Sequence, residues 1–288
     1  MASRQRPLIT VLTRALRFIR FSHTIFAMPF ALGAMLVAAG GLPSAKTIAL
    51  IVLAMVCART AAMAFNRVVD WELDKRNPRT AQRHTLLPRP AAITLVVVSA
   101  AAFVAVTWFI NWLCFALSPL ALAIVFFYSL TKRFTHASQF FLGLALAVSP
   151  MGAWFAVTGA WAWTPCILAA AVLAWVAGFD LIYATQDYEH DCAAGLHSMV
   201  VKLGIPRALS LAKILHAAAI ALLGGFGAAA GLGAPYWCAL VIIAGALVYE
   251  HRSAMRLDLA GINRAFFLSN AVVGVVFVAG VAADVLRR

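Results

Sequence analysis

Nine apolar runs recur along these 288 residues, and most of them are long enough to cross a lipid bilayer. The runs lie at Phe21–Gly40, Ala45–Phe65, Ala91–Ile110, Cys114–Leu130, Gln139–Ala160, Thr164–Thr185, Ala208–Gly231, Tyr236–Tyr249 and Ala265–Val285. A spanning helix needs about 20 predominantly apolar residues, so only the eighth run is clearly short. Because backbone polar groups must be paired inside lipid, such runs fold as helices. The sequence therefore predicts an all-α integral membrane protein, a bundle of nine transmembrane helices.

Composition agrees with this class, since 64% of the residues are hydrophobic, 11% are charged and the mean hydropathy is +0.92. The net charge of +13 would suit a nucleic-acid-binding protein, but the cations lie at the ends of the apolar runs and form no long basic patch. The positive-inside rule accounts for them better. We therefore expect the lipid bilayer as a partner and no nucleic acid.

Lys and Arg are distributed unequally between the two sides of the predicted bundle. Of the 23, 19 fall on the side of the N-terminus, Lys46, Arg287 and Arg288 fall on the other side, and Arg59 lies inside the second run. Cytoplasmic loops carry the excess of positive charge, so the N-terminus is expected in the cytoplasm. Residues 1–20 then form a basic cytoplasmic segment of a single membrane domain that spans residues 1–288.

Two acidic stretches follow the second and sixth runs, and they contain seven of the ten acidic residues. In the first stretch Asn66, Asp70 and Asp74 are spaced four apart, so on a helix they share one face. The second stretch repeats the spacing with Asp187 and Asp191. Oxygen side chains in this arrangement suit a hard divalent cation such as Mg²⁺. We expect the two stretches to hold a diphosphate through Mg²⁺ at the cytoplasmic mouth of a central cavity.

Several charged residues admit two interpretations. The first acidic stretch contains its own cations, and the alternative interpretation is a solvated loop in which its acids pair with them. Asp180 and Arg59 are predicted at membrane depth, where charge is costly and marks a functional site by default. Arg59 either neutralises Asp180 or binds an anionic group of a substrate. Further cations either contact phosphate or only determine topology: Arg76, Arg79, Arg83, Lys132, Arg133 and Lys202.

Other chemistries have little support in the sequence. The five cysteines form no CxxC pair, and the seven histidines show no repeated spacing, which argues against a zinc site. Neither a GxGxxG nor a Walker-type loop occurs, so ATP and dinucleotide chemistry are not expected. A secondary transporter remains the non-enzymatic alternative, although transporter sites lie near the bilayer midplane and both acidic stretches here lie at one face.

Three motifs resemble those of the UbiA superfamily of intramembrane aromatic prenyltransferases. They are Asn66-x-x-x-Asp70-x-x-x-Asp74, Asn77-Pro78-Arg79-Thr80-x-x-Arg83 and Tyr183-Ala184-x-x-Asp187-x-x-x-Asp191. The position of Arg59 and the segment Tyr128-x-x-x-Lys132-Arg133 also resemble that family. Many members have Asp directly after the Asn of the first motif. Here Arg67 stands at that position, which removes one possible oxygen from the metal shell.

The resemblance implies a Mg²⁺-dependent enzyme of a bacterial inner membrane that transfers a polyprenyl group from a polyprenyl diphosphate to an aromatic acid of the 4-hydroxybenzoate type, in quinone biosynthesis. The implied catalytic residues are Asp70, Asp74, Asp187 and Asp191, which with Asn66 would also bind the metal. The implied substrate-binding residues are Arg59, Asn66, Arg76, Lys132, Arg133, Asp180, Tyr183 and Lys202. Other acceptors stay open: 1,4-dihydroxy-6-naphthoate for menaquinone, haem, a chlorin or a glycerol phosphate lipid.

Overall fold

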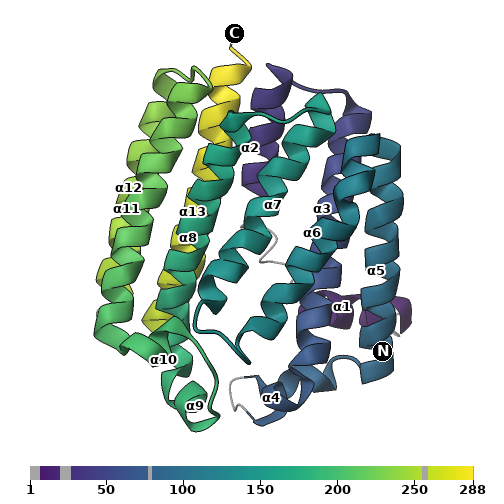
Figure 1. The fold of residues 1–288 in the computed structure, drawn as a ribbon, viewed down its shortest axis with the longest axis vertical. Coiled ribbons are helices and arrows are strands. Elements are labelled where there is room, and N and C mark those ends of the chain that lie inside the picture. The colour runs from purple at the N-terminus through teal and green to yellow at the C-terminus, as the bar shows by residue number, and fades with distance from the viewer. Residues whose placement is uncertain (1–6, 20–26, 77–79, 255–258, 288) are drawn as a thin grey trace, which may run out of the picture.

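The computed structural model describes residues 7–19, 27–76, 80–254 and 259–287, and in these ranges all regular secondary structure is helical (Figure 1). The long helices are α3 (Ala45–Val69), α5 (Arg89–Ile110), α6 (Trp112–Thr131), α7 (Ser138–Thr158), α8 (Trp163–Ala184), α11 (Ile205–Ala229), α12 (Ala234–Ala254) and α13 (Leu259–Val285). The short ones are α1 (Pro7–Phe18), α2 (Met28–Ala39), α4 (Trp71–Arg76), η2 (Ala81–Thr85), η3 (Thr185–Asp187), α9 (Tyr188–Ala193) and α10 (Met199–Leu203).

Eight helices in the described part of the chain are long and apolar enough to cross a membrane, which confirms an integral membrane fold. The predicted first span is represented by α2, whose 12 residues rise only about 18 Å. Residues 20–26, the beginning of that predicted span, lie outside the described residues. The count of nine therefore stays a prediction.

The eighth predicted run, Tyr236–Tyr249, is shorter than the helix that contains it, because α12 extends from Ala234 to Ala254. Glu250 lies in α12, directly after the end of the predicted run. In the structure its side chain is 1% exposed, and the Asn270 side-chain amide on α13 donates a hydrogen bond of 3.1 Å to it. A buried hydrogen-bonded carboxyl can lie inside a helix bundle, so the charge does not end the helix.

Helix α8 lies between α7 and α11 and is the most buried of the spans (Figure 1). Its Trp175 packs against Phe30 of α2 at a ring-centroid distance of 4.9 Å, and Phe30 in turn stacks on Phe277 of α13 at 4.7 Å. The aromatic rings therefore join three helices that are far apart in the sequence. Away from this core, α12 pairs with α13, and α3 pairs with α5.

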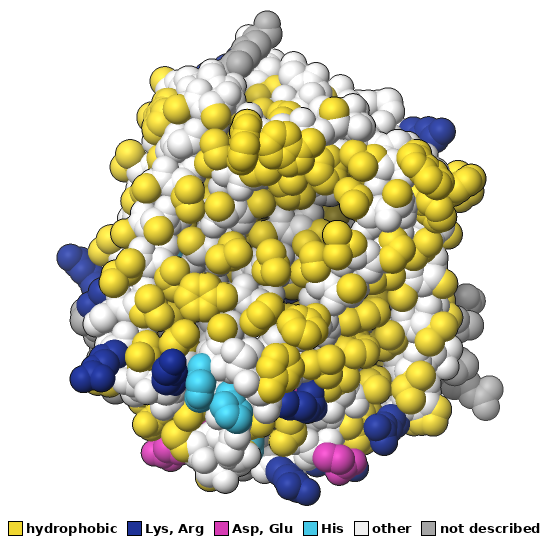
Figure 2. Space-filling view, viewed as in Figure 1, with side chains coloured by type: hydrophobic (Ala, Val, Ile, Leu, Met, Phe, Trp, Pro, Cys, Tyr) yellow, Lys and Arg dark blue, Asp and Glu magenta, His cyan; other side chains and the backbone are white. Residues whose placement is uncertain are grey.

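The short helices α4, α9 and α10 gather at one end of the bundle, the lower end in Figure 1. Figure 2, in the same orientation, shows most charged and histidine side chains of this face at that end, below a broad apolar band. The two acidic stretches lie on α3, α4, η3 and α9, so they share one end of the molecule as predicted. Helix α1 lies crosswise near the same end, and the buried Phe18 that closes it belongs to a cluster with Trp71 of α4.

Close helix packing around α8 depends on small residues. A Cβ atom added to Gly143 of α7 would lie 2.5 Å from the backbone oxygen of Leu173, whereas one added to Gly152 of the same helix meets nothing within 4 Å. We expect Gly143→Ala to destabilise the protein by about 1–3 kcal/mol through overpacking. Gly152→Ala should be neutral or stabilise it by up to about 1 kcal/mol through helix propensity. Thermal unfolding in detergent measures both, and equal midpoints would contradict the close α7–α8 contact.

Candidate active site

A polar pocket of about 260 Å³ opens among the ends of α3, α6 and α8 and the short helices beside them. Five carboxylates line it: Asp70, Asp74, Asp180, Asp187 and Asp191. The two sequence motifs, which are more than a hundred residues apart, therefore face one space. The predicted meeting of the two acidic stretches is confirmed at the level of this pocket.

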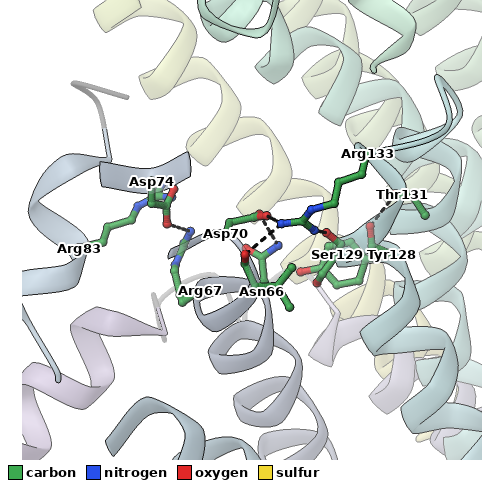
Figure 3. Close-up of polar contacts among 10 residues, drawn as sticks. Asn66, Arg67, Asp70, Asp74, Arg83, Tyr128, Ser129, Thr131 and Arg133 are labelled. Atoms are coloured by element: carbon green, nitrogen blue, oxygen red, sulfur yellow. Dashed lines mark hydrogen bonds and ion pairs between the residues drawn. The ribbon is translucent and has the colours of Figure 1, made fainter. Parts of the chain in front are cut away.

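The first stretch continues from α3 into α4 with a slight irregularity at Asp70, which caps α3. Helical hydrogen bonding persists, since the backbone N–H of Asp74 donates to the Asp70 carbonyl at 2.7 Å. The Asp70 carboxylate accepts from the Asn66 side-chain amide at 3.3 Å and from Arg133 Nη2 at 3.0 Å (Figure 3). Arg133 Nη2 also donates to the Val69 carbonyl at 3.0 Å, so it joins the end of α3 to the end of α6.

Asp74 lies in a separate set of ion pairs. Its Oδ2 is 3.4 Å from Arg67 Nη1, and its Oδ1 is 3.0 Å from Arg83 Nη1 (Figure 3). The Thr80 hydroxyl donates to the Asp74 backbone oxygen at 2.9 Å and ties the following segment to α4. The side chain of Arg67 thus points into the pocket, and it joins α3 to α4.

The second stretch begins on α8 and runs through η3 into α9. Asp180 lies in the last turns of α8, Asp187 ends η3, and Asp191 on α9 is only 5% exposed. Tyr183 lines the same pocket, where its ring lies 4.7 Å from that of Phe266 on α13. The pocket therefore has an acidic wall from α8 and α9 and an aromatic base between α8 and α13.

Lys132 follows α6 and faces the carboxylates of both stretches. Burial alone lowers the pKa of its ammonium, but Asp180, Asp191 and then Asp70 outweigh that effect and raise the pKa above its usual value. For Asp70, burial raises the pKa of the carboxyl, and the nearby cations Lys132 and Arg133 oppose the rise. Lys132 therefore stays protonated at neutral pH, and it lines the pocket.

The structure gathers most of the predicted site residues and leaves two apart. Arg59, Asn66, Lys132, Arg133, Asp180 and Tyr183 line the pocket together with the four motif aspartates. Arg76 and Lys202 are exposed and do not line it. Lining residues that the motifs did not assign include Arg67, Ser129, Phe179, His190 and Phe266. The spacing could have indicated that Arg67 lies near Asp74, because Arg67 precedes Asp74 by two helical turns.

An apolar cavity of about 470 Å³ lies deeper in the bundle, among α3, α5, α6 and α7. It shares five lining residues with the polar pocket: Arg59, Met63, Tyr128, Leu142 and Leu146. Along α6 the lining extends from Tyr128 back to Cys114, a helical rise of about 21 Å. A charged head and a long hydrocarbon chain of one ligand therefore find adjoining spaces.

The chemistry of the polar pocket suits Mg²⁺, since its side-chain donors are carboxylate and amide oxygens. Within the described ranges, no three His, Cys, Asp or Glu side chains are placed to hold a metal ion by themselves. Protein sites for Mg²⁺ commonly supply one or two carboxylates, and substrate phosphates complete the shell. The residues therefore fit a metal that arrives with a diphosphate.

Sequence comparison identifies similar proteins over most of the chain. Residues 27–271 match the UbiA prenyltransferase family. The 4-hydroxybenzoate octaprenyltransferase of Methylococcus capsulatus is 33% identical over 260 residues, which cover 89% of this chain and 88% of that protein. The protein of the same name from Vibrio cholerae is 30% identical over 259 residues, covering 88% and 90%.

Solved structures agree with this match. The apo structure of a UbiA homologue from Aeropyrum pernix K1 has a TM-score of 0.83 and 32% identity, and the alignment covers 92% of this chain and 98% of that one. A UbiA homologue from Archaeoglobus fulgidus, bound to GPP and Mg²⁺, shares the fold at a TM-score of 0.74 and 22% identity, covering 96% and 100%. By sequence and by fold, this chain belongs to the UbiA prenyltransferase family.

Proposed function

We propose that this prenyltransferase moves a polyprenyl group from a polyprenyl diphosphate to an aromatic acid of the 4-hydroxybenzoate type. The observation that carries the proposal is the junction of a pocket rich in charge with a large apolar cavity. The relatives from Methylococcus capsulatus and Vibrio cholerae, both named 4-hydroxybenzoate octaprenyltransferase, favour this acceptor. The positive charge at the end that carries the site supports a mouth, and an N-terminus, on the cytoplasmic side of a bacterial inner membrane.

The diphosphate belongs in the polar pocket. Asn66, Asp70, Asp187 and Asp191 would hold Mg²⁺ together with the diphosphate oxygens, and the metal would act there as a Lewis acid that stabilises the leaving diphosphate. Lys132 contributes a fixed positive charge from the end of α6. Cations that are already in position stabilise the negative charge that develops on the diphosphate in the transition state. They do so without having to rearrange as the bond breaks.

The isoprenoid chain belongs in the apolar cavity, where its burial is favourable and water is excluded. In the reaction the allylic C1–O bond breaks, and its electron pair stays on the diphosphate. A ring carbon of the acceptor then bonds to C1, and the ring loses a proton. Exclusion of water from the cavity protects the allylic cation from hydrolysis.

Arg59 would bind the acceptor, and this role is supported by its position in the lining of both the polar pocket and the apolar cavity. A benzoate carboxylate can pair with its guanidinium through two parallel hydrogen bonds. The ring then lies near the junction of the two spaces, where C1 of the prenyl chain must also lie. Tyr128 lines the same junction and limits the space available to the ring.

The metal assignment predicts that Asp70→Asn and Asp191→Asn lower kcat by about 10²-fold or more, because each variant loses a ligand charge at the leaving group. Pyrophosphate release from a prenyl diphosphate, measured against Mg²⁺ concentration, tests this prediction. Glu72→Gln is the matched control, since Glu72 lies between the motif aspartates but is exposed and pairs with Lys75 at 3.1 Å. Full activity in either aspartate variant would exclude that residue as a ligand.

The acceptor assignment predicts a specific effect of Arg59→Lys. Lysine keeps the charge but loses the planar fork that pairs with a carboxylate. We expect the KM for the aromatic acid to rise about 10- to 100-fold, by analogy with the loss of a charged hydrogen bond. The KM for the prenyl diphosphate and the thermal midpoint should change little. A lower midpoint with an unchanged aromatic KM would make Arg59 a structural residue.

A further inference from the structure

Arg67 has no role in the reaction described so far, although it directly follows Asn66 in the first motif. It extends from α3, is 6% exposed and lines the polar pocket. Each oxygen of Asp74 is bonded to a different guanidinium, Oδ2 to Arg67 and Oδ1 to Arg83 (Figure 3). We call these three residues the Asp74 triad. Two cations and one anion give the triad a net charge of +1 on the pocket wall.

The Asp74 triad is more buried than the ion pair at Asp70. Side chains of Arg67, Asp74 and Arg83 are 7%, 15% and 16% exposed, whereas those of Arg133 and Asp70 are 37% and 21% exposed. Breaking a buried pair leaves an uncompensated charge in a poorly solvated place, and is strongly unfavourable. The Asp70–Arg133 pair lies nearer to solvent, chiefly on the arginine side, and an ion pair nearer to solvent contributes less to stability. Replacing Arg133 at Asp70 by a metal therefore costs less than replacing either arginine at Asp74.

We propose that Asp74 is not a metal ligand and that it positions Arg67 and Arg83 as a preformed binding site for the diphosphate. The inference rests on the proposed function and deepens it, since it makes Arg67 a substrate-contacting residue. A guanidinium has five N–H donors, each arginine gives one of them to an Asp74 oxygen, and both arginines line the polar pocket. Planar guanidinium groups suit phosphate because they can form two parallel hydrogen bonds.

The positions of the triad residues support a preformed site. Arg67 comes from α3, Asp74 from α4 and Arg83 from η2, so Asp74 joins three separate elements. The bond from the Thr80 hydroxyl to the Asp74 backbone oxygen holds the approach to η2 in place. Arginines fixed in this way lose little side-chain entropy when the ligand binds, which favours affinity.

Binding of inorganic pyrophosphate to the purified full-length protein tests the inference without turnover. Calorimetry is done with Mg²⁺ and with EDTA. We expect Arg67→Gln to weaken pyrophosphate binding about 10- to 100-fold both with Mg²⁺ and with EDTA. This factor is the one expected when a hydrogen bond to a charged group is lost. Asp74→Asn should weaken pyrophosphate binding by a similar factor. The Mg²⁺ concentration that gives half of the Mg²⁺-dependent increase in binding should stay the same in this variant. Asp70→Asn should raise that Mg²⁺ concentration and leave binding in EDTA unchanged.

Two further variants keep the test decisive if Asp74→Asn folds poorly. Arg67→Lys keeps a cation beside Asp74 but loses the fork, so it should weaken pyrophosphate binding while the thermal midpoint stays near that of the wild type. Glu72→Gln, on the exposed side of α4, should bind like the wild type. The double variant Arg67→Gln/Asp74→Asn should lose less than the sum of the two single losses, because the residues act together.

Opposite results would overturn the inference in distinguishable ways. If Asp74→Asn raises the Mg²⁺ requirement as Asp70→Asn does, Asp74 is a metal ligand. If Arg67→Gln binds pyrophosphate like the wild type, Arg67 does not contact the diphosphate. In both cases the proposed function stands. A wild-type protein that binds neither pyrophosphate nor a prenyl diphosphate would overturn the proposed function and this inference together.

Discussion

Five carboxylates meet in one pocket at one end of the bundle, and nearby cations offset their mutual repulsion. The cations come from several directions: Arg67 from α3, Arg83 from η2, and Lys132 and Arg133 from the end of α6. The segments after α3 and α6 therefore have to turn back over the pocket. The short helices α4, α9 and α10 gather at that end of the molecule (Figure 1).

Those features that depend on local spacing or on charge along the chain could be predicted from the sequence. The i, i+4 acids and the bias of Lys and Arg placed both acidic stretches at one end, as the structure has them. The spacing of Arg67 and Asp74 was visible in the sequence, but the second guanidinium on Asp74, that of Arg83 from η2, could not be predicted. The continuation of α12 through Glu250 could not be predicted either, since the partner of Glu250, Asn270, lies on another helix. For Arg76 and Lys202, charge alone could not tell a pocket residue from an exposed one.

The depth of the site follows from rigid helices rather than from loops. Arg59 and Asn66 lie on the same helix, two turns apart, so their separation along the bundle axis is set by helix geometry. Helix α8 holds Asp180 at a matching position, supported by α7 and α11 on either side. The close contact of Gly143 with the α8 backbone keeps α7 near enough to border both the pocket and the cavity.

The junction at Arg59, Met63, Tyr128, Leu142 and Leu146 also bears on how the products leave. In the proposed reaction, the donor has its head in the polar pocket and its chain in the apolar cavity before the bond breaks. Afterwards the two parts are separate molecules with opposite solubilities. Pyrophosphate partitions toward water at the charged end, while the prenylated ring has no diphosphate to hold it there and partitions toward the hydrocarbon of the bilayer. Because the two products leave in different directions, they do not meet again at the site, and the reverse reaction is disfavoured.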